Sequence, residues 1–223
     1  MTILVKICGL NSADTVDTAV KAGTDMVGFN FFPKSPRYVD PDTAGGLAGR
    51  VPDRVIKVGL FVEPTDDELA AMLTRVPLDM IQLHGQEDPA RVAHVRDRFA
   101  KPVMKVIGVS DAADLSRAAG YKGAADRLLL DAKPPKGADR PGGNAVSFDW
   151  TMLSGWTAPM PWMLAGGLNP GNVAEAVSIS HAPGVDVASG VESAPGVKDN
   201  AAIKAFIDAA RVAAPVKEPG LFL

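Results

Sequence analysis

A short apolar segment followed by a helix-like segment recurs about eight times along the chain, and this repeat restricts the fold more than any other feature. The apolar segments are rich in Val, Ile, Leu and Met and show little alternation, which is typical of parallel strands covered by helices on both faces. We expect strands at residues 2–8, 25–31, 55–62, 79–84, 102–108, 126–132, 160–166 and 184–189. Eight such units in 223 residues favour one closed barrel over an open doubly wound sheet.

Helix-start signals occupy the segments between these strands. Thr65 is expected to cap a helix, with Glu68 three residues later as its capping-box partner. Asp88 followed by Pro89 predicts another helix start, because Asp is a good cap and Pro fits the first helical turn. The pattern therefore predicts an α/β protein with a (β/α)8 fold of the TIM-barrel type.

No linker or low-complexity stretch divides the chain, so we expect a single barrel domain over residues 1–213 and a tail over 214–223. The segment 133–145, rich in Pro and Gly, is predicted to be a long loop after the sixth strand rather than a domain boundary. Apolar helix faces and the Leu-Phe-Leu end could close the barrel or support a dimer, so monomer and homodimer both stay open.

Composition excludes several classes of protein. The formal net charge of −3 and the lack of basic runs or C2H2 spacing indicate that the chain binds no nucleic acid. One cysteine cannot form an internal disulfide, and no His, Asp or Glu grouping has metal-ligand spacing, so we predict no metal. The N-terminus lacks a signal-peptide pattern and no apolar stretch reaches the roughly 20 residues that span a bilayer. We expect a cytoplasmic protein without membrane association.

The first predicted strand ends in Cys8, at the end of the barrel where enzymes of this fold build their active sites. Lys6 lies two residues earlier, and a nearby cation could lower the pKa of the thiol toward neutrality. The thiolate could then act as a nucleophile or a general base. Free cysteines are also common small residues of protein cores, so a packing role stays equally open.

Asp131 directly follows the apolar run 128–130 of the sixth strand. A capping role is less favoured, because the long loop follows rather than a helix. In a partly dry site, desolvation would raise the pKa of the carboxyl and allow it to act as a general acid. Gln82 and His84, at the end of the fourth strand, and Lys6 are expected to line the same site.

Glycine clusters end the last two strands, with Gly166 and Gly167 after the seventh and Ser189 and Gly190 after the eighth. Loops at these two positions commonly bind phosphate through backbone N–H groups. Arg37 lies in a loop with two prolines after the second strand and could bind a carboxylate with two hydrogen bonds. An isolated arginine is otherwise expected to be a solvated surface residue.

Eight short motifs follow one another along nearly the whole chain. They are K-I-C-G at 6–9, G-F-N-F-F-P-K-S-P-R-Y-V at 28–39, V-G-L-F-V at 58–62, I-Q-L-H-G at 81–85, L-D-A-K at 130–133, F-D-W at 148–150, L-A-G-G-L at 164–168 and S-G-V-E at 189–192. In this order and spacing the chain resembles the phosphoribosylanthranilate isomerases of tryptophan biosynthesis. It departs from their pattern at Ala145, where the family commonly has Gly in a loop that we expect to close over the site.

The resemblance implies an Amadori rearrangement, without a cofactor, of N-(5′-phosphoribosyl)anthranilate to 1-(2-carboxyphenylamino)-1-deoxyribulose 5-phosphate. It implies that Cys8 is the general base, that Asp131 is the general acid and that Arg37 meets the anthranilate carboxylate. The partner is thus a small phosphorylated substrate. We expect its phosphate on residues 166–167 and 189–190, on the opposite side of the mouth from Arg37.

Other functions fit the same barrel. A ribulose-phosphate epimerase would require several metal-ligating histidines at strand ends, where only His84 is available. A bifunctional isomerase that also acts on the histidine-pathway aminoaldose would carry aspartates at both catalytic positions, whereas the first position here is Cys8. A non-catalytic phosphate sensor would have no need of a matched acid and base such as Asp131 and Cys8.

Overall fold

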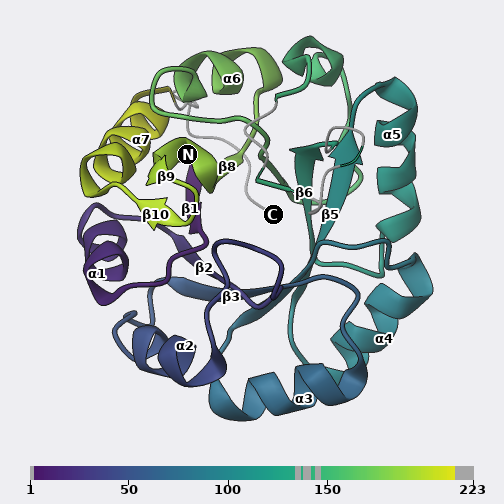
Figure 1. Ribbon diagram of the computed structural model, residues 1–223. Coiled ribbons are helices and arrows are strands. Elements are labelled where there is room, and N and C mark those ends of the chain that lie inside the picture. Colours follow the sequence, from purple (N-terminus) through teal and green to yellow (C-terminus); the bar gives the residue numbers. More distant parts are fainter. Residues whose placement is uncertain (1–2, 134–136, 138–141, 144–146, 214–223) are drawn as a thin grey trace.

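Eight parallel strands form a closed barrel in the computed structural model, which describes residues 3–133, 137, 142–143 and 147–213 (Figure 1). The strands are β1 (Leu4–Cys8), β2 (Met26–Asn30), β3 (Ile56–Phe61), β4 (Met80–Leu83), β5 (Val103–Val109), β6 (Arg127–Ala132), β7 (Trp162–Leu164) and β8 (Gly184–Val187). Each pairs with the next, and β8 pairs with β1, so the barrel sheet has no free edge. Every expected strand overlaps an observed one, and the predicted (β/α)8 fold is confirmed.

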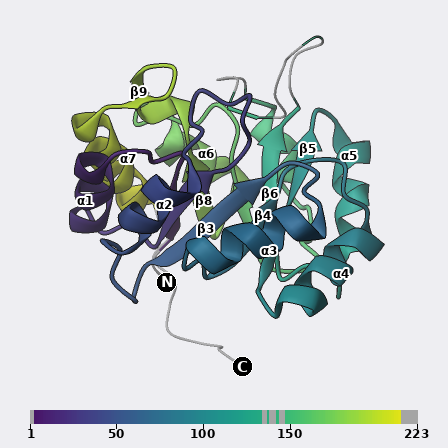
Figure 2. The ribbon, with the colours of Figure 1, turned by 60° about the horizontal axis from the view of Figure 1, so that its bottom comes forward.

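Helices surround the barrel and cover the outer face of the sheet (Figures 1 and 2). They are α1 (Ala13–Lys21), α2 (Pro41–Ala48), α3 (Asp66–Arg75), α4 (Pro89–Phe99), α5 (Ala112–Ser116), α6 (Val173–Ser180) and α7 (Asn200–Ala213), with 3-10 turns η1 (Arg117–Tyr121) and η2 (Trp150–Leu153). Thr65 and Glu68 form the predicted capping box at the start of α3. Asp88 caps α4 with Pro89 in its first turn, also as predicted.

The apolar residues form two separate layers. The larger one lies between the strands and the helices and includes Val5, Ile7 and Phe29. The smaller one fills the barrel interior and is rich in methionine; its buried members are Met26, Val58, Met80, Met104, Val106, Leu129, Met163 and Ala165. Because successive side chains of a strand point to opposite faces, the inner row also continues upward to polar residues at the strand ends.

A small hairpin that the sequence did not predict covers part of the barrel mouth. The 3-10 turn η3 (Ser189–Val191) follows β8 and leads into β9 (Glu192–Ala194) and β10 (Val197–Lys198), which pair antiparallel. In Figure 2 the hairpin lies at the upper end of the barrel, opposite the end from which β1 starts. It therefore adds side chains to the face on which the candidate site lies.

The expected tail at 214–223 lies outside the described residues, as does most of the expected loop 133–145, including Ala145. Among the helices of the described part of the chain, none has the length and apolar character needed to cross a bilayer.

Candidate active site

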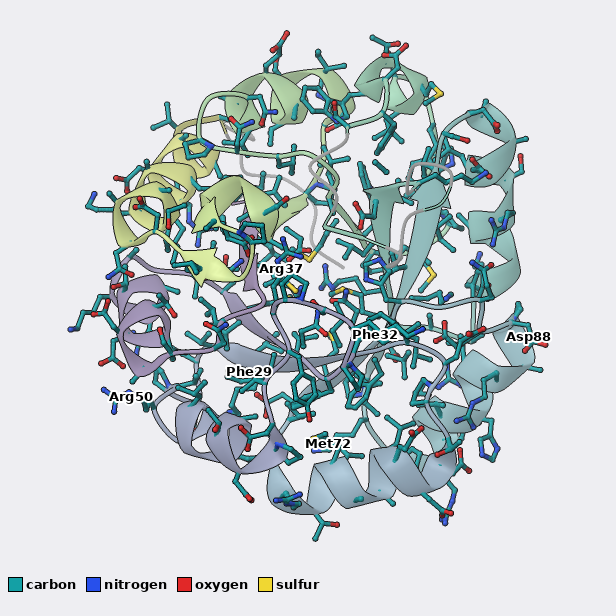
Figure 3. All side chains as sticks on the ribbon, viewed as in Figure 1. Phe29, Phe32, Arg37, Arg50, Met72 and Asp88 are labelled. Carbon is teal, nitrogen blue, oxygen red and sulfur yellow. The ribbon has the colours of Figure 1, made fainter. Side chains whose placement is uncertain are left out.

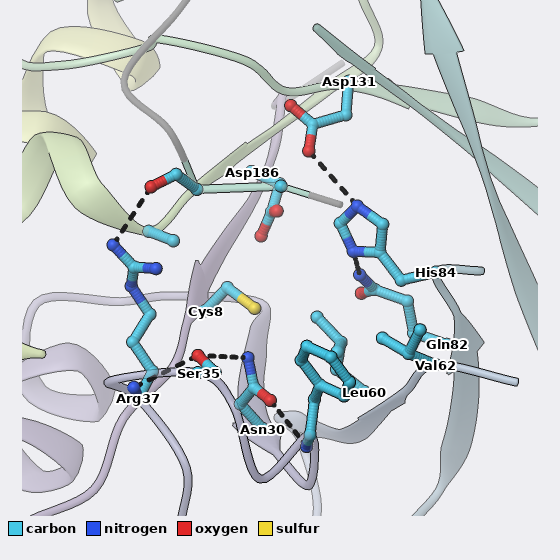
Figure 4. Close-up of a pocket in the computed structure, with 14 residues that line it drawn as sticks. Cys8, Asn30, Ser35, Arg37, Leu60, Val62, Gln82, His84, Asp131 and Asp186 are labelled. Carbon is cyan, nitrogen blue, oxygen red and sulfur yellow. Dashed lines mark hydrogen bonds and ion pairs between the residues drawn. The ribbon is translucent and has the colours of Figure 1, made fainter. Parts of the chain in front are cut away.

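A pocket opens at the centre of the barrel, where the strands end (Figure 4). It is lined by the predicted site residues Cys8, Arg37, Gln82, His84 and Asp131. They come from β1, β4, β6 and the loop after β2, segments that lie far apart in the sequence. The closed parallel sheet brings their ends together, as sequence analysis predicted.

Cys8 is buried at the end of β1, with only 4% of its surface exposed. Gly28 on β2 lies beside it, and a Cβ at that position would come within 2.9 Å of the Cys8 Sγ. Burial raises the pKa of the thiol, although the charge of Lys6 and its hydrogen bond act to lower it. The expectation that Lys6 brings the pKa of the thiol down toward neutrality is therefore wrong, because desolvation has the larger effect.

Lys6 lies fully buried next to Cys8 rather than on the pocket wall, where we had expected it. Its Nζ donates to Asp186 Oδ1 at 2.8 Å. Burial would lower the pKa of Lys6, but the charges of Asp186 and Cys8 outweigh it and raise the value to about 12. The lysine is thus a fixed positive charge, and Asp186, which sequence analysis missed, lines the pocket beside it.

Asp131 lies at the end of β6 and is 7% exposed. Its Oδ1 accepts the backbone N–H of Ala132, and its Oδ2 lies 3.4 Å from His84 Nε2 (Figure 4). The other ring nitrogen of His84 lies 3.5 Å from Gln82 Nε2. Within the described residues, His84 Nε2 and Gln82 Oε1 are buried without a hydrogen-bond partner.

Arg37 is buried, with 4% of its surface exposed, so the surface interpretation is wrong. Figure 3 shows it near the centre of the barrel mouth, whereas Arg50 extends from the rim. Arg37 donates from Nε to Glu192 Oε1 at 2.7 Å and from Nη2 to Glu192 Oε2 at 2.9 Å. Because Glu192 follows Gly190 by two residues, Arg37 stands beside the loop after β8 and not opposite to it.

The loop that carries Arg37 is anchored by the side chain of Asn30, at the end of β2. Asn30 Oδ1 accepts the backbone N–H of Phe32 at 2.9 Å, and Nδ2 donates to Ser35 Oγ at 3.2 Å. Ser35 Oγ in turn accepts the backbone N–H of Arg37 at 3.1 Å. These hydrogen bonds hold the chain in place where it leaves the sheet after β2. They thereby fix the backbone of Arg37, whose guanidinium extends into the mouth of the barrel.

An apolar wall borders the pocket beside this loop. Phe32, Leu60 and Val62 contribute side chains to it, and they come from the ends of β2 and β3. The site thus combines a cation, a carboxyl group, a thiol and an apolar surface, a set that suits an aromatic acid better than a sugar alone.

The predicted phosphate residues Gly166, Gly167 and Ser189 line a second pocket that shares Asp131 and Asp186 with the first. Gly166 and Gly167 have φ values of +87° and +64°, which favour glycine. Gly190 is not among the lining residues, because it packs against the neighbouring loop: a Cβ there would lie 1.8 Å from the Leu168 carbonyl oxygen. The lack of a side chain at Gly190 allows the two glycine loops to approach each other closely.

In the part of the chain that the structure describes, no group of three or more His, Cys, Asp or Glu side chains is arranged to hold a metal ion.

Comparisons with known proteins agree with one another. The family model for N-(5′-phosphoribosyl)anthranilate (PRA) isomerase matches residues 5–209. The N-(5′-phosphoribosyl)anthranilate isomerase of Paramagnetospirillum magneticum is 60% identical over 215 residues, which cover 96% of this chain and 100% of that protein. The crystal structure of phosphoribosyl anthranilate isomerase from Thermotoga maritima is similar with a TM-score of 0.85 at 36% identity, covering 94% of this chain and 99% of the other. A phosphoribosyl anthranilate isomerase in complex with reduced 1-(o-carboxyphenylamino)-1-deoxyribulose 5-phosphate has a TM-score of 0.82 at 34% identity, with coverage of 94% and 99%.

Proposed function

Because the chain belongs to the N-(5′-phosphoribosyl)anthranilate isomerase family and is an enzyme of tryptophan biosynthesis, we propose that it rearranges phosphoribosylanthranilate with Asp131 as general acid and Cys8 as general base. The observation that carries this assignment is that the one thiol of the chain and Asp131 line the same buried pocket. A matched acid and base at the mouth of a barrel is what an isomerisation by proton transfer requires.

The first step opens the sugar ring. The protonated Asp131 carboxyl donates its proton to the furanose ring oxygen, and the C1′–O bond breaks. The lone pair of the anilino nitrogen forms the C1′=N bond, which gives a cationic Schiff base and an ionised Asp131. His84 Nε2, 3.4 Å from Asp131 Oδ2, stands next to this carboxylate.

The second step removes a proton from C2′. The positive Schiff base acidifies this C–H bond, and the Cys8 thiolate takes the proton to give an enolamine. Burial favours the neutral thiol, so the thiolate depends on positive charge nearby. Lys6 supplies one such charge permanently, and the Schiff base supplies a second when it forms.

The enolamine then becomes the ketone, as C1′ gains a proton and the 2′ hydroxyl loses one. C1′ receives the proton that the Cys8 thiol holds, and the Asp131 carboxylate takes the proton of the 2′ hydroxyl, so both groups return to their starting states. Hydrogen moves only within the substrate and through these two groups. The rearrangement therefore needs no external oxidant, reductant or cofactor.

The two anionic groups of the substrate fix its orientation in the site. The phosphate fits the pocket of Gly166, Gly167 and Ser189, and the anthranilate carboxylate fits Arg37. The apolar wall can hold the aromatic ring between them. A family member of known structure binds the reduced product analogue, which has these same groups. Holding the ribose at a fixed orientation between the acid and the base accounts for a large part of the expected acceleration.

The test follows the fluorescence of freshly generated phosphoribosylanthranilate after the protein is added. The wild type should remove the signal, and Cys8→Ser and Asp131→Asn should each lower kcat by about 10²-fold or more, the usual contribution of a placed proton-transfer group. Asp208→Asn, the same change at an exposed position of α7, should retain wild-type activity. A wild-type protein without turnover would reject the assignment, and full activity in either site variant would reject the role of that residue.

A further inference from the structure

One buried carboxylate at the mouth has no part in the proton transfers. Glu192 begins strand β9, has a side chain that is 4% exposed and contacts Arg37 rather than the space for the ribose. We propose that Glu192, itself held by Lys198, is a positioning residue that aims the Arg37 guanidinium at the carboxylate of the substrate. This inference rests on the proposed function and adds to it the determinant of specificity for an aromatic carboxylic acid.

The contact between Glu192 and Arg37 fixes the guanidinium in its own plane. Two parallel hydrogen bonds, of 2.7 and 2.9 Å, use the Nε–H and one Nη2–H. A bidentate pair of this kind sets direction as well as distance. Nη2 also donates to the Gly143 carbonyl oxygen at 3.4 Å, and within the described residues the Nη1 hydrogens have no acceptor. The guanidinium edge that Glu192 leaves unused can bind a ligand.

The carboxylate is held as firmly as the arginine. Lys198, with no exposed side-chain surface, donates to Glu192 Oε1 at 2.8 Å and to the Ala188 carbonyl at 2.7 Å. The backbone N–H of Gly196 donates to Glu192 Oε2 at 3.2 Å. The β9–β10 hairpin thus orients both carboxylate oxygens toward Arg37.

The charges of this cluster suit the capture of one anion. A single Arg–Glu pair would be nearly neutral and would attract a substrate carboxylate weakly. Here Arg37 and Lys198 carry two positive charges against the single negative charge of Glu192, so one positive charge remains. Burial lowers the dielectric around these groups and strengthens their attraction for a carboxylate that enters the pocket.

Three glycines pack closely around Arg37 and the residue before it, in positions that leave no room for a side chain. Gly9 has φ +75°, and a Cβ there would lie 2.6 Å from Arg37 Cδ. Gly143 has φ +70°, and a Cβ there would lie 2.5 Å from Arg37 Nη1. On the hairpin, a Cβ at Gly196 would lie 2.2 Å from the Pro36 carbonyl oxygen. The aliphatic arm, the guanidinium and the preceding residue of Arg37 are therefore each in contact with a glycine.

The test compares two substrates in Glu192→Gln. A neutral amide cannot accept both Arg37 bonds and the Lys198 bond, so the KM for phosphoribosylanthranilate should rise about tenfold to hundredfold, while kcat changes much less. N-phosphoribosylaniline, which lacks the carboxylate, should be used equally well by the variant and the wild type. Ser193→Ala, an exposed neighbour on β9, is the matched control and should leave both substrates unaffected.

A cycle with Arg37→Met separates positioning from a general structural role. If Glu192 acts through Arg37, Glu192→Gln should add little to the KM of Arg37→Met. Glu192→Asp keeps the negative charge, but its side chain is one methylene shorter, so the carboxylate lies farther from Arg37 and the KM should rise. This variant tests the inference even if Glu192→Gln folds poorly. An unchanged KM in Glu192→Asp, or an equal loss of kcat for both substrates, would overturn the inference. An inactive wild type would instead reject the proposed function, which makes the two failures distinguishable.

Discussion

Two lysines of the barrel, Lys6 on β1 and Lys105 on β5, each form a buried ion pair, yet the two pairs lie in different layers of the molecule. Lys6 Nζ lies 2.8 Å from Asp186 Oδ1, and Lys105 Nζ lies 2.6 Å from Glu87 Oε2. All four side chains are at most 8% exposed. By distance and burial alone the pairs would be considered equivalent.

Their positions in the strands separate them. Lys6 precedes Cys8 by two residues, so both side chains point to the inner face of the sheet, where Cys8 reaches the pocket. Lys105 alternates with Met104 and Val106, which belong to the inner layer, so its side chain points outward. One residue of difference in strand phase places one lysine beside the Cys8 thiol and the other under the surrounding loops.

The surroundings of the outer pair show what it does. Lys105 Nζ also donates to the Gly85 carbonyl at 2.7 Å, and Glu87 accepts the backbone N–H groups of Glu63 and Gly85 at 2.8 and 2.9 Å. Burial lowers the pKa of Lys105, because the charge of Glu87 compensates only in part, whereas the pKa of Lys6 rises to about 12. The outer pair ties together the loops after β3 and β4, whereas in the inner pair Lys6 lies beside the thiol and its charge acts to lower the thiol pKa.

Replacing the inner lysine should have the largest effect on stability. In Lys6→Met, Asp186 would lose the one side-chain partner that the described residues provide, and an uncompensated buried carboxylate costs about 3–5 kcal/mol. Urea unfolding should report this loss. Lys6→Met combined with Asp186→Leu removes both charges and should recover much of it; a double variant no more stable than the single one would contradict this account of the inner pair.

The outer pair should tolerate the same substitution better. In Lys105→Met, Glu87 keeps its backbone N–H donors from Glu63 and Gly85, so unfolding should become easier by only about 1–3 kcal/mol. The kcat/KM should stay close to that of the wild type, because Lys105 does not face the pocket. A loss of activity comparable to that of Lys6→Met would show that strand phase does not separate the two roles.

The titration of Cys8 offers a direct measure of the contrast. The charge of Lys6 acts to lower the pKa of the thiol, so in Lys6→Met this pKa should rise further above its ordinary value. Lys105→Met should leave it where it is in the wild type. The rate of alkylation of the single cysteine against pH reports both values. An unchanged alkylation profile in Lys6→Met would end the idea that Lys6 tunes the thiol.

The contrast between the two lysines also marks the limit of what the sequence could predict. All eight strands were predictable, because parallel strands buried on both faces are nearly continuous apolar runs. In such a strand the residues that face inward and the residues that face outward are both apolar. The residues around Lys105 therefore do not indicate whether its side chain points into the barrel or toward the helices. The sequence could place Cys8 and Asp131 at the same pocket because both lie at the carboxyl ends of strands. Asp186 is a charge inside an apolar strand, and that signal could have indicated its buried role.

The least predictable feature was the contact of Arg37 with Glu192. It joins residues 155 positions apart through a hairpin whose strands have three and two residues, too short to produce a recognisable pattern. The expected placement of the phosphate loop opposite Arg37 failed for the same reason. Because β8 pairs with β1 and β1 pairs with β2, the loop after β8 lies close to the loop after β2. The two loops are far apart in the sequence, so the sequence does not reveal that they are close.

A third lysine forms an ion pair in which its own side chain is half exposed, and this pair should contribute less to stability than the two buried pairs. Lys133, of the L-D-A-K motif, lies 2.5 Å from Asp114 Oδ1, and its side chain is 41% exposed. Burial would raise the pKa of Asp114, but Lys133 and hydrogen bonds from Ser110 outweigh it and lower the pKa to about 2. The folded value lies below the ordinary 3.8, so this carboxylate stabilises the fold above pH 3.8 and the contribution disappears as the pH falls through about 2.

Lys133→Met should therefore raise the pKa of Asp114 and make the protein lose stability at a less acidic pH. Solvent screens the exposed ammonium and Ser110 keeps its bonds to Asp114, so the loss at neutral pH should stay below about 1 kcal/mol. Urea midpoints measured from pH 7 down to about pH 2, with exposed Lys204→Met as control, test this. A neutral-pH loss as large as that of Lys105→Met would mean that exposure does not rank these pairs, and the distinction between buried and half-exposed lysines would have to be abandoned.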